Sequence, residues 1–309
     1  MGGGDSGSSL GPRLGMHVSI SGGMDRMAER ARDYGCEAVQ IFSRSPRGGK
    51  ARALSAEEVA GARSVLEAAD VRPLVVHTPY FANLVAGDKD LRRYAVETVA
   101  EDLHRASELG SPYVVTHVGR PAPDLHPEAA RELAAESLSS VLRAQGGTGG
   151  VILLLENTAG SEREMGASLE DLAGLLGRVE AGFPGRLGVC LDTCHAHAAG
   201  YDLSRPASVR RFIDLALELF GPERVRVVHA NDSLAAAGSR LDRHAPVGAG
   251  TIGESGFRAL LGDPRLRGCP FLVETPGTDE ERARDLERLR RLRQAAGGGE
   301  TASGEETGR

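Results

Sequence analysis

Histidines and carboxylates recur at the ends of short apolar runs along this chain. Six successive runs each end in such a side chain, or within one residue of it: His77, His117, Glu156, Asp192, His229 and Glu274. Imidazole nitrogens and carboxylate oxygens together suit zinc, with manganese or iron as substitutes. If these side chains meet in space, they repel one another or stay unsatisfied unless a cation joins them. The pattern therefore predicts a metal centre.

Three further residues extend this candidate ligand set to nine. His195 comes just after the fourth of these runs, and Asp242 and His244 stand two apart, so both can point to one side of an extended segment. Nine ligands exceed the needs of one metal and fit three metals with open positions. Such a cluster can neutralise a phosphate, lower the pKa of a bound water and stabilise a leaving oxygen. We therefore expect phosphodiester hydrolysis. Our candidates for the catalytic carboxylates are Glu156 and Glu274.

The cysteines leave a second metal interpretation open. Cys190 and Cys194 flank Asp192 and could bind a metal themselves, although no second cysteine pair accompanies them. Four cysteines spread over a chain of this length do not form a disulfide framework. Reduced thiols and a cytoplasmic location are therefore expected. No apolar run approaches the roughly 20 residues of a membrane helix.

Short apolar runs rich in β-branched residues alternate with longer helical patterns. The predicted strands are Leu14–Ile20, Ala38–Phe42, Leu74–His77, Tyr113–His117, Val151–Glu156, Leu187–Asp192, Val225–Ala230 and Pro270–Glu274. This alternation is typical of a parallel sheet with crossover helices, and eight repeats predict a closed α/β TIM barrel. The strand-end side chains would then share the C-terminal face of the barrel, where active sites of this fold lie.

Apolar residues at a period near 3.6 predict the helices between these strands. They include Leu91–Leu109, Leu169–Val179, Val209–Phe220 and Glu280–Leu292. Ser55 and Glu58 form a capping box that predicts a further helix before the third strand. The last helix is dense in Arg and Glu, but Leu286, Leu289 and Leu292 give it an apolar face. That face favours a solvated outer barrel helix over a nucleic-acid patch.

Length and composition favour a single barrel domain over residues 14–293. Segments 1–13 and 294–309 are expected to be disordered tails, because they are rich in small and polar residues. The formal net charge of −6 argues weakly against a DNA-binding protein, since phosphate attraction favours basic surfaces. Acids in the tails, and any acid bound to a metal, reduce that objection.

Several segments carry a resemblance to one known family. They are His77–Asn83, Leu155–Gly160, Gly188–Asp202, His229–Ser233 and Gly238–His244. Together they resemble the signatures of endonuclease IV, which is AP endonuclease family 2 in the xylose-isomerase-like TIM barrel superfamily. The similarity covers almost the whole expected domain.

The resemblance implies a trinuclear zinc site and an endonuclease of base excision DNA repair. One zinc would take His77, His117 and Glu156, a second Glu156, Asp192, His229 and Glu274, and a third His195, Asp242 and His244. The family hydrolyses the phosphodiester 5′ to an abasic site, leaves a 3′-hydroxyl and flips the damaged nucleotide out of the duplex. Double-stranded DNA with abasic or 3′-blocked sites is the implied partner, and a monomer is expected.

Arg47, Tyr80 and Phe81 occupy positions from which the family contacts DNA. A capped loop without DNA contact is the alternative for Tyr80 and Phe81. Two departures from the family pattern fall on the same kind of surface. Gly49 stands where an aromatic residue is usual, and Leu234 stands where a lysine is usual. Both departures weaken the expectation of tight DNA binding more than that of catalysis.

Other interpretations remain open at this level. His17, after the first strand, could support the metal centre or contact a phosphate, or it could be a packed strand-end residue. A metal-dependent sugar isomerase or epimerase of the same barrel group is the alternative function, but His195, Asp242 and His244 would have no purpose in it. A metal- or DNA-binding protein without catalysis is the third possibility.

Overall fold

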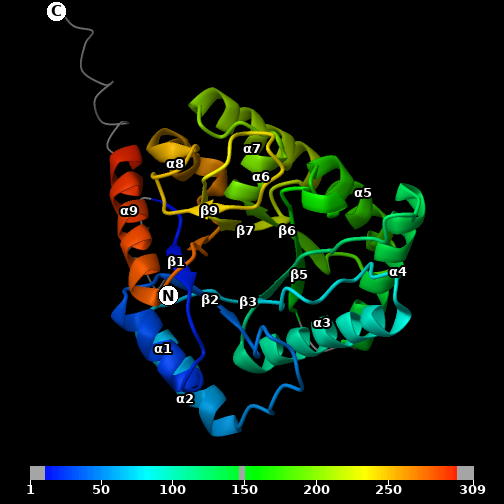
Figure 1. Cartoon of the computed structure of the whole chain (residues 1–309). Helices are drawn as coiled ribbons and strands as arrows, with labels where there is room; N and C mark the ends of the chain where they lie inside the picture. Colours follow the sequence, from blue (N-terminus) through cyan, green and yellow to red (C-terminus); the bar gives the residue numbers. More distant parts are fainter. Residues whose placement is uncertain (1–10, 146–149, 298–309) are drawn as a thin grey trace, which may run out of the picture.

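The computed structural model describes residues 11–145 and 150–297, and in them the chain forms a closed barrel of eight parallel strands (Figure 1). The barrel strands are β1 (Leu14–His17), β2 (Ala38–Phe42), β3 (Leu74–His77), β4 (Tyr113–Thr116), β5 (Ile152–Glu156), β6 (Leu187–Asp192), β7 (Val225–His229) and β10 (Phe271–Val273). They pair in chain order around the ring, and β10 closes it against β1. The predicted TIM barrel is confirmed.

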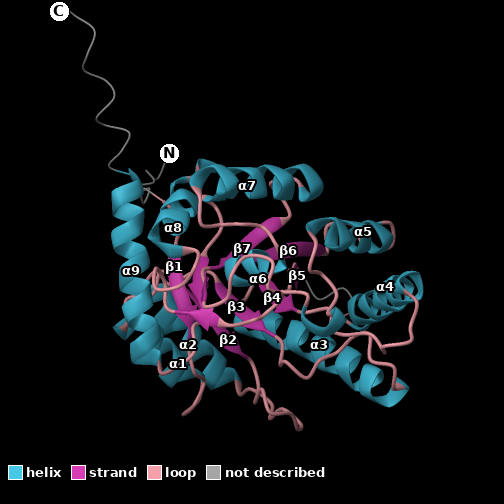
Figure 2. Ribbon diagram, turned by 45° about the horizontal axis from the view of Figure 1, so that its top comes forward, coloured by secondary structure: helices cyan, strands magenta, loops and turns pink. Residues whose placement is uncertain are grey.

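Helices surround the barrel (Figures 1 and 2). They are α1 (Met24–Asp33), α2 (Ala56–Ala68), α3 (Lys89–Leu109), α4 (Pro127–Ala144), α5 (Leu169–Glu180), α6 (Thr193–Ala199), α7 (Pro206–Phe220), α8 (Gly253–Gly262) and α9 (Asp279–Gly297). The remaining described elements are the 3-10 turns η1 (Ser161–Arg163) and η2 (Pro264–Leu266), and the antiparallel pair β8 (Asp232–Ser233) and β9 (His244–Ala245). None of the helices in the described ranges is long and apolar enough to span a membrane.

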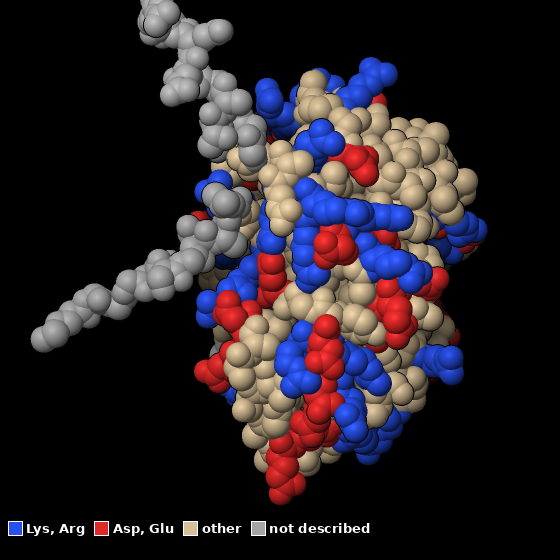
Figure 3. Space-filling view, turned by 90° about the vertical axis from the view of Figure 1, so that its left-hand side faces the viewer, with Lys and Arg blue, Asp and Glu red and all other residues tan. Residues whose placement is uncertain are grey.

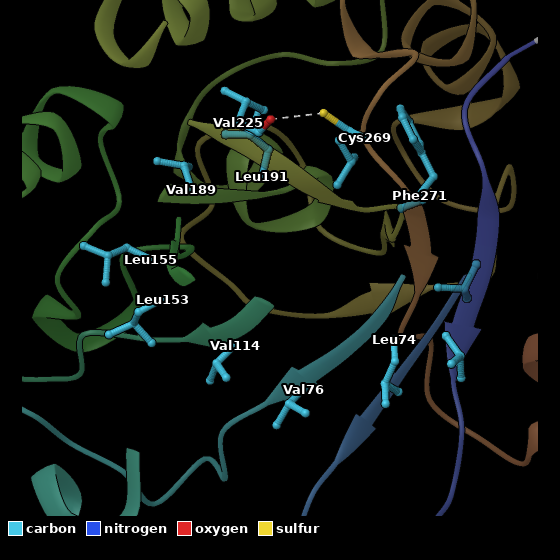
Figure 4. Packing of buried hydrophobic residues seen from close by; sticks show 14 of the residues in the cluster. Leu74, Val76, Val114, Leu153, Leu155, Val189, Leu191, Val225, Cys269 and Phe271 are labelled. Atoms are coloured by element: carbon cyan, nitrogen blue, oxygen red, sulfur yellow. Dashed lines mark hydrogen bonds between the residues drawn. The ribbon is translucent and has the colours of Figure 1, made fainter. Parts of the chain in front are cut away.

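The barrel strands are apolar on both faces because alternate side chains enter two different layers of the core. One layer fills the barrel interior and consists of Ala38, Val75, Val115, Leu154, Cys190, Val227 and Leu272. Residues on the opposite face pack in the layer beneath the helices, as Figure 4 shows for Val76, Val114 and Leu153. In that layer the Cys269 thiol donates to the Val225 carbonyl at 3.3 Å. The interior is therefore a packed core, and buried polar side chains gather at the C-terminal strand ends.

Three strands, β2, β3 and β6, have the predicted bounds, and the others are shorter than predicted. His229 is consequently the last residue of β7, while His117 and Glu274 lie one residue beyond β4 and β10. These shifts do not change which end of the barrel the side chains occupy. The short β8–β9 pair was not predicted.

Two local predictions differ from the structure. The first strand ends three residues earlier than expected, because the Ile20 carbonyl accepts a hydrogen bond from Gly23 N–H at 3.0 Å and turns the chain into α1. Ser55 caps α2 by accepting from Glu58 N–H at 3.1 Å. The Glu58 carboxylate accepts from Met24 N–H at 3.0 Å and so links α2 to α1. The predicted return contact of the capping box is therefore wrong.

The last helix has the predicted character of an outer barrel helix. Its three leucines are buried, and the side of the molecule that carries α9 shows interspersed charges of both signs (Figure 3). One such pair is Arg290 with Glu287, at 3.1 Å. The helix continues to Gly297, past the predicted domain end at residue 293. Residues 1–10 and 298–309, which hold most of the predicted tails, lie outside the described residues.

Candidate metal centre

The predicted ligand residues converge at the C-terminal end of the barrel. In four groups, each residue offers one ligand atom, and these atoms lie within 4.8 Å of one another. The groups are His77, His117 and Glu156; Glu156, Asp192, His229 and Glu274; Asp192, His195 and His244; and Cys194, Asp242 and His244. All nine predicted residues belong to these groups. They come from the ends of six barrel strands, from α6, from the connection that leads into β9, and from β9 itself.

His77 and His117 present the same ring nitrogen to Glu156. Each Nε2 lies 3.1 Å from Glu156 Oε2. Behind the rings, His77 Nδ1 donates to the Thr78 carbonyl at 2.7 Å, and His117 Nδ1 lies 3.2 Å from Glu164 Oε1. An acceptor behind Nδ1 keeps the proton there and leaves the Nε2 lone pair free, which is the arrangement that metal-binding histidines need.

Glu156 and Glu274 are the central carboxylates of the second group. His229 Nδ1 lies 2.9 Å from Glu156 Oε1, 2.9 Å from Glu274 Oε2 and 3.9 Å from Asp192 Oδ2. Burial alone would raise the pKa of Glu156, but His229 and His117 hold that pKa well below its usual range. Burial alone would lower the pKa of His117, yet Glu156 raises it to about 10. A field that holds protons on imidazoles this strongly also favours a divalent cation.

Asp242 lies between His195 of the third group and His244, which the third and fourth groups share. Its Oδ2 lies 3.3 Å from His195 Nε2, and its Oδ1 lies 3.3 Å from His244 Nε2. Despite this proximity, His244 Nε2 is buried and makes no hydrogen bond to any of the described residues. A buried nitrogen in that state is costly, so the donor set fits a bound cation. Together, the three overlapping groups of histidine and carboxylate residues fit a multinuclear metal centre.

The two cysteines of the alternative metal interpretation are also close to this centre. Cys194 joins Asp242 and His244 in one of the groups. Burial raises the pKa of the Cys190 thiol to about 12, and it raises the pKa of Cys194 to the same value. Without a metal, both thiols therefore stay protonated at neutral pH, and a protonated thiol is a poor ligand.

Two asparagines that received no role in the sequence analysis hold Asp192. Asn157 binds its backbone twice, accepting from Asp192 N–H at 2.8 Å and donating to the Asp192 carbonyl at 3.0 Å. Asn231 donates to Asp192 Oδ2 at 2.6 Å and accepts from Glu274 N–H at 2.8 Å. Their positions in the sequence could have identified them, because each follows a predicted ligand by one or two residues.

Gln40 and His17 line the inner side of the same centre. Gln40 is fully buried and contacts Glu274, His229 and His17, but it was not predicted from the sequence. The one sequence feature that could have identified Gln40 is that it is a polar residue inside the apolar run of β2. His17 Nδ1 lies 3.7 Å from Glu274 Oε1, and its ring packs on Phe42 with centroids 4.4 Å apart. His17 is therefore both packed and adjacent to the candidate ligands.

A cavity of about 1700 Å³ opens over the centre. Five arginines line it: Arg120, Arg163, Arg240, Arg243 and Arg282. Outside the ligand set, its acidic lining residues are Asp88, Glu162 and Glu164. The rim thus carries a surplus of positive charge although the chain as a whole is negative, which suits a polyanionic ligand.

The three predicted DNA-contact residues differ in their placement. Tyr80 lines the cavity and is 74% exposed, with its ring centroid 5.3 Å from that of Phe42. Phe81 is half-buried and stacks on Tyr94 at 5.5 Å, outside the cavity lining. Arg47 is exposed on the β2–α2 loop and also lies outside the lining. Only Tyr80 therefore projects toward the metal centre.

The two departures from the family pattern are both on the surface. Leu234 lines the cavity and is 65% exposed. Gly49 is exposed, and a side chain added there would meet no atom within 4 Å. Neither position touches a candidate ligand in the described hydrogen bonds.

Comparisons with known proteins agree with this geometry. Residues 28–294 match a family model described as a xylose isomerase-like TIM barrel. Endonuclease 4 of Thermus thermophilus is 43% identical over 282 residues, which are 90% of this chain and 97% of that protein. The chain belongs to the endonuclease IV family. A probable endonuclease 4 of Methanosphaerula palustris is 38% identical over 281 residues, covering 91% of this chain and 98% of that one.

One solved structure also places the chain in this family. A crystal structure of endonuclease IV from Thermus thermophilus aligns with a TM-score of 0.81 at 40% identity, over 92% of this chain and all of that one. A D-tagatose 3-epimerase-like protein aligns with a TM-score of 0.71 at 21% identity, over 94% of this chain and all of that one. Likeness at that identity is likeness of fold alone. The shared fold is therefore the only support for the sugar isomerase or epimerase alternative.

Proposed function

We propose that the chain is an apurinic/apyrimidinic endonuclease of base excision DNA repair. As a metal-dependent phosphodiesterase, it hydrolyses the bond 5′ to an abasic site in double-stranded DNA and leaves a 3′-hydroxyl. The observation that carries this proposal is the convergence of nine histidine and carboxylate residues at the barrel mouth. Relatives that bear the name endonuclease 4 support DNA as the substrate.

Three zinc ions are the cofactors that we propose. They would be held by His77, His117 and Glu156; by Glu156, Asp192, His229 and Glu274; and by His195, Asp242 and His244. Bound divalent ions supply neutralisation of the phosphate, a lower water pKa and stabilisation of the leaving oxygen.

Glu156 is the residue best placed to serve two ions. Its Oε2 faces His77 and His117, each at 3.1 Å, while its Oε1 faces His229 at 2.9 Å and His195 at 3.3 Å. This division of its two oxygens supports a bridging role. Glu274, 2.9 Å from the same His229 nitrogen, holds the opposite side of the second group.

In this proposal, the residues around the cavity bind the DNA duplex. The rim arginines would hold backbone phosphates, and the exposed face of Tyr80 would contact the bases beside the lesion. Arg47 and Phe81 are secondary candidates, because both lie outside the cavity lining. We further propose that 3′-blocked ends are substrates, that the chain acts as a monomer, and that it works in the cytoplasm, where its four free cysteines stay reduced.

The test is incubation of the zinc-loaded protein with a duplex that carries one abasic site, followed by identification of the new end. We expect a 3′-hydroxyl, whereas an unsaturated sugar end would show a lyase and contradict the proposal. Elemental analysis should find about three zinc equivalents per chain. One equivalent would contradict the trinuclear site.

The variant Glu274→Gln tests whether the Glu274 carboxylate has a catalytic role, as distinct from an effect of removing any negative charge. This variant should fold and lose nicking of the abasic duplex. The matched control is Glu132→Gln, which removes an exposed carboxylate on α4 and should nick like the parent protein. Equal nicking by the two variants would contradict the assignment of Glu274.

A further inference from the structure

A buried glutamine lies directly behind the second group of candidate ligands. Gln40 is fully buried in β2, where its backbone is in register with His17 of β1 and Val75 of β3. It is not a member of the proposed ligand set. Its side chain nevertheless contacts two members of that set, His229 at the end of β7 and Glu274 just after β10.

The Glu274 carboxylate decides how the Gln40 amide is oriented. A carboxylate accepts hydrogen bonds and cannot donate them, so the amide NH2 group must face it. Gln40 Nε2 donates to Glu274 Oε1 in a close hydrogen bond, and it also lies 3.3 Å from His17 Nδ1. The amide oxygen is left facing His229 Nε2 at 2.9 Å. Because that oxygen only accepts, the neutral His229 ring must carry its proton on Nε2.

We propose that Gln40 is a positioning residue that holds His229 as the tautomer presenting Nδ1 to a metal ion. Nδ1 faces Glu156 Oε1 and Glu274 Oε2, each at 2.9 Å. A nitrogen lone pair opposed to two carboxylates is repelled unless a proton or a metal cation lies among them. The inference rests on the proposed metal-dependent function.

The same amide also fixes the second ligand that it touches. Its NH2 group holds Oε1 of Glu274, while Oε2 is the oxygen that faces His229. One side chain on β2 therefore orients ligands from β7 and β10, although β1 separates β2 from β10 in the barrel. A hydrogen-bond acceptor behind a metal-binding imidazole raises its basicity and fixes its ring, and losing such a partner typically costs about 10- to 100-fold in metal affinity.

The first test is nitrogen NMR of the zinc-loaded protein, with the His229 signals assigned by their loss in His229→Gln. The wild-type ring should show a hydrogen-bonded proton on Nε2 and a metal-shifted Nδ1. Gln40→Met, which removes donor and acceptor at similar length, should lose the hydrogen-bonded character of that proton. Gln40→Glu keeps an acceptor opposite Nε2 and should retain it. A proton on Nδ1 in the wild type, or an unchanged Nε2 proton in Gln40→Met, would overturn the proposal.

The second test is zinc affinity, measured by competition with a chromophoric chelator. Gln40→Met should bind its most weakly held zinc about 10- to 100-fold less tightly. The matched control is Ser111→Ala, which removes a buried hydroxyl that lies 2.7 Å from the Leu74 carbonyl oxygen and 2.9 Å from that of Tyr113, away from the ligand set. This control should keep the wild-type affinity. Equal affinity in Gln40→Met and Ser111→Ala would contradict a role toward the metal.

These measurements distinguish a failure of the proposed function from a failure of the proposed role of Gln40. A wild-type protein that binds zinc but does not nick abasic DNA would contradict the proposed substrate and leave the His229 tautomer measurement intact. A wild-type protein that nicks abasic DNA, with a Gln40→Met variant unchanged in spectrum and zinc affinity, would contradict only the role of Gln40.

Discussion

The metal centre and the rim of the cavity are built in opposite ways. Strand-end ligands such as Asp192 are buried and held by further hydrogen bonds, here from Asn157 and Asn231, whereas Asp242 is an exposed loop residue. Rim residues lie on loops and are open to solvent, with Tyr80 74% and Leu234 65% exposed. The comparison indicates that the barrel fixes the chemistry in advance, whereas the contacts with substrate can adjust when it binds.

The β2–α2 loop lies outside the cavity lining, but it shows how a loop at the C-terminal end of the barrel is attached. Arg105 of α3 donates to the Ser43 carbonyl at 2.5 Å and to the Arg52 carbonyl at 2.8 Å. These bonds fix both ends of the loop, and Arg47 and Gly49 are exposed between them. The loop is therefore anchored to the barrel wall at its ends while its tip is free to meet a ligand.

The largest expected effect comes from changing the centre itself. Glu156→Gln should lower both abasic DNA cleavage and hydrolysis of the small ester bis(p-nitrophenyl) phosphate by about a thousandfold or more, because metal assistance is worth several kcal/mol of barrier. The measurement is kcat/KM on both substrates together with zinc content. Glu132→Gln is the control. A Glu156→Gln variant that loses DNA cleavage but keeps hydrolysis of the small ester would contradict the distinction between the metal centre and the cavity rim.

An intermediate effect is expected on the rim. Tyr80→Ala should lower kcat/KM for abasic DNA about 10- to 100-fold, because stacking on a base contributes about 1–3 kcal/mol. Hydrolysis of the small ester should change little. Phe81→Ala removes a similar ring that packs on Tyr94, so it should lower the melting temperature more and DNA cleavage less. A larger loss of DNA cleavage in Phe81→Ala than in Tyr80→Ala would reverse the roles of the two rings.

The smallest expected effect concerns Leu234. Leu234→Lys adds a positive charge at the cavity lining and should tighten DNA binding at low salt, steepening the dependence of log Kd on log salt by about one. The readout is fluorescence anisotropy with an abasic duplex over a series of salt concentrations. Gln294→Lys adds the same charge to an exposed position of α9, outside the cavity, and should leave the slope as it is. Equal slopes for both variants would contradict the proposal that Leu234 lies on the DNA-binding surface.

The barrel and most of its candidate ligands could be predicted from the sequence, for a physical reason. Runs such as Leu74–His77 and Leu187–Asp192 are apolar until their last residue, and parallel strands all end at the same face of a closed barrel. The ends of such runs therefore identify which side chains meet, even without coordinates. His244 was found differently, from its spacing of two residues from Asp242, although the β8–β9 pair that carries it was not predicted.

Side-chain partners across the barrel were decided by the tertiary structure alone. Nothing in the run Ala38–Phe42 says that Gln40 faces His229, because that contact joins residues far apart in sequence and depends on strand register and closure. The same holds for Phe81, whose ring is turned from the cavity because α3 brings Tyr94 against it. Sequence determined which chemical groups gather at the barrel mouth, and packing determined how each is oriented, since orientation depends on neighbours that only the closed fold supplies.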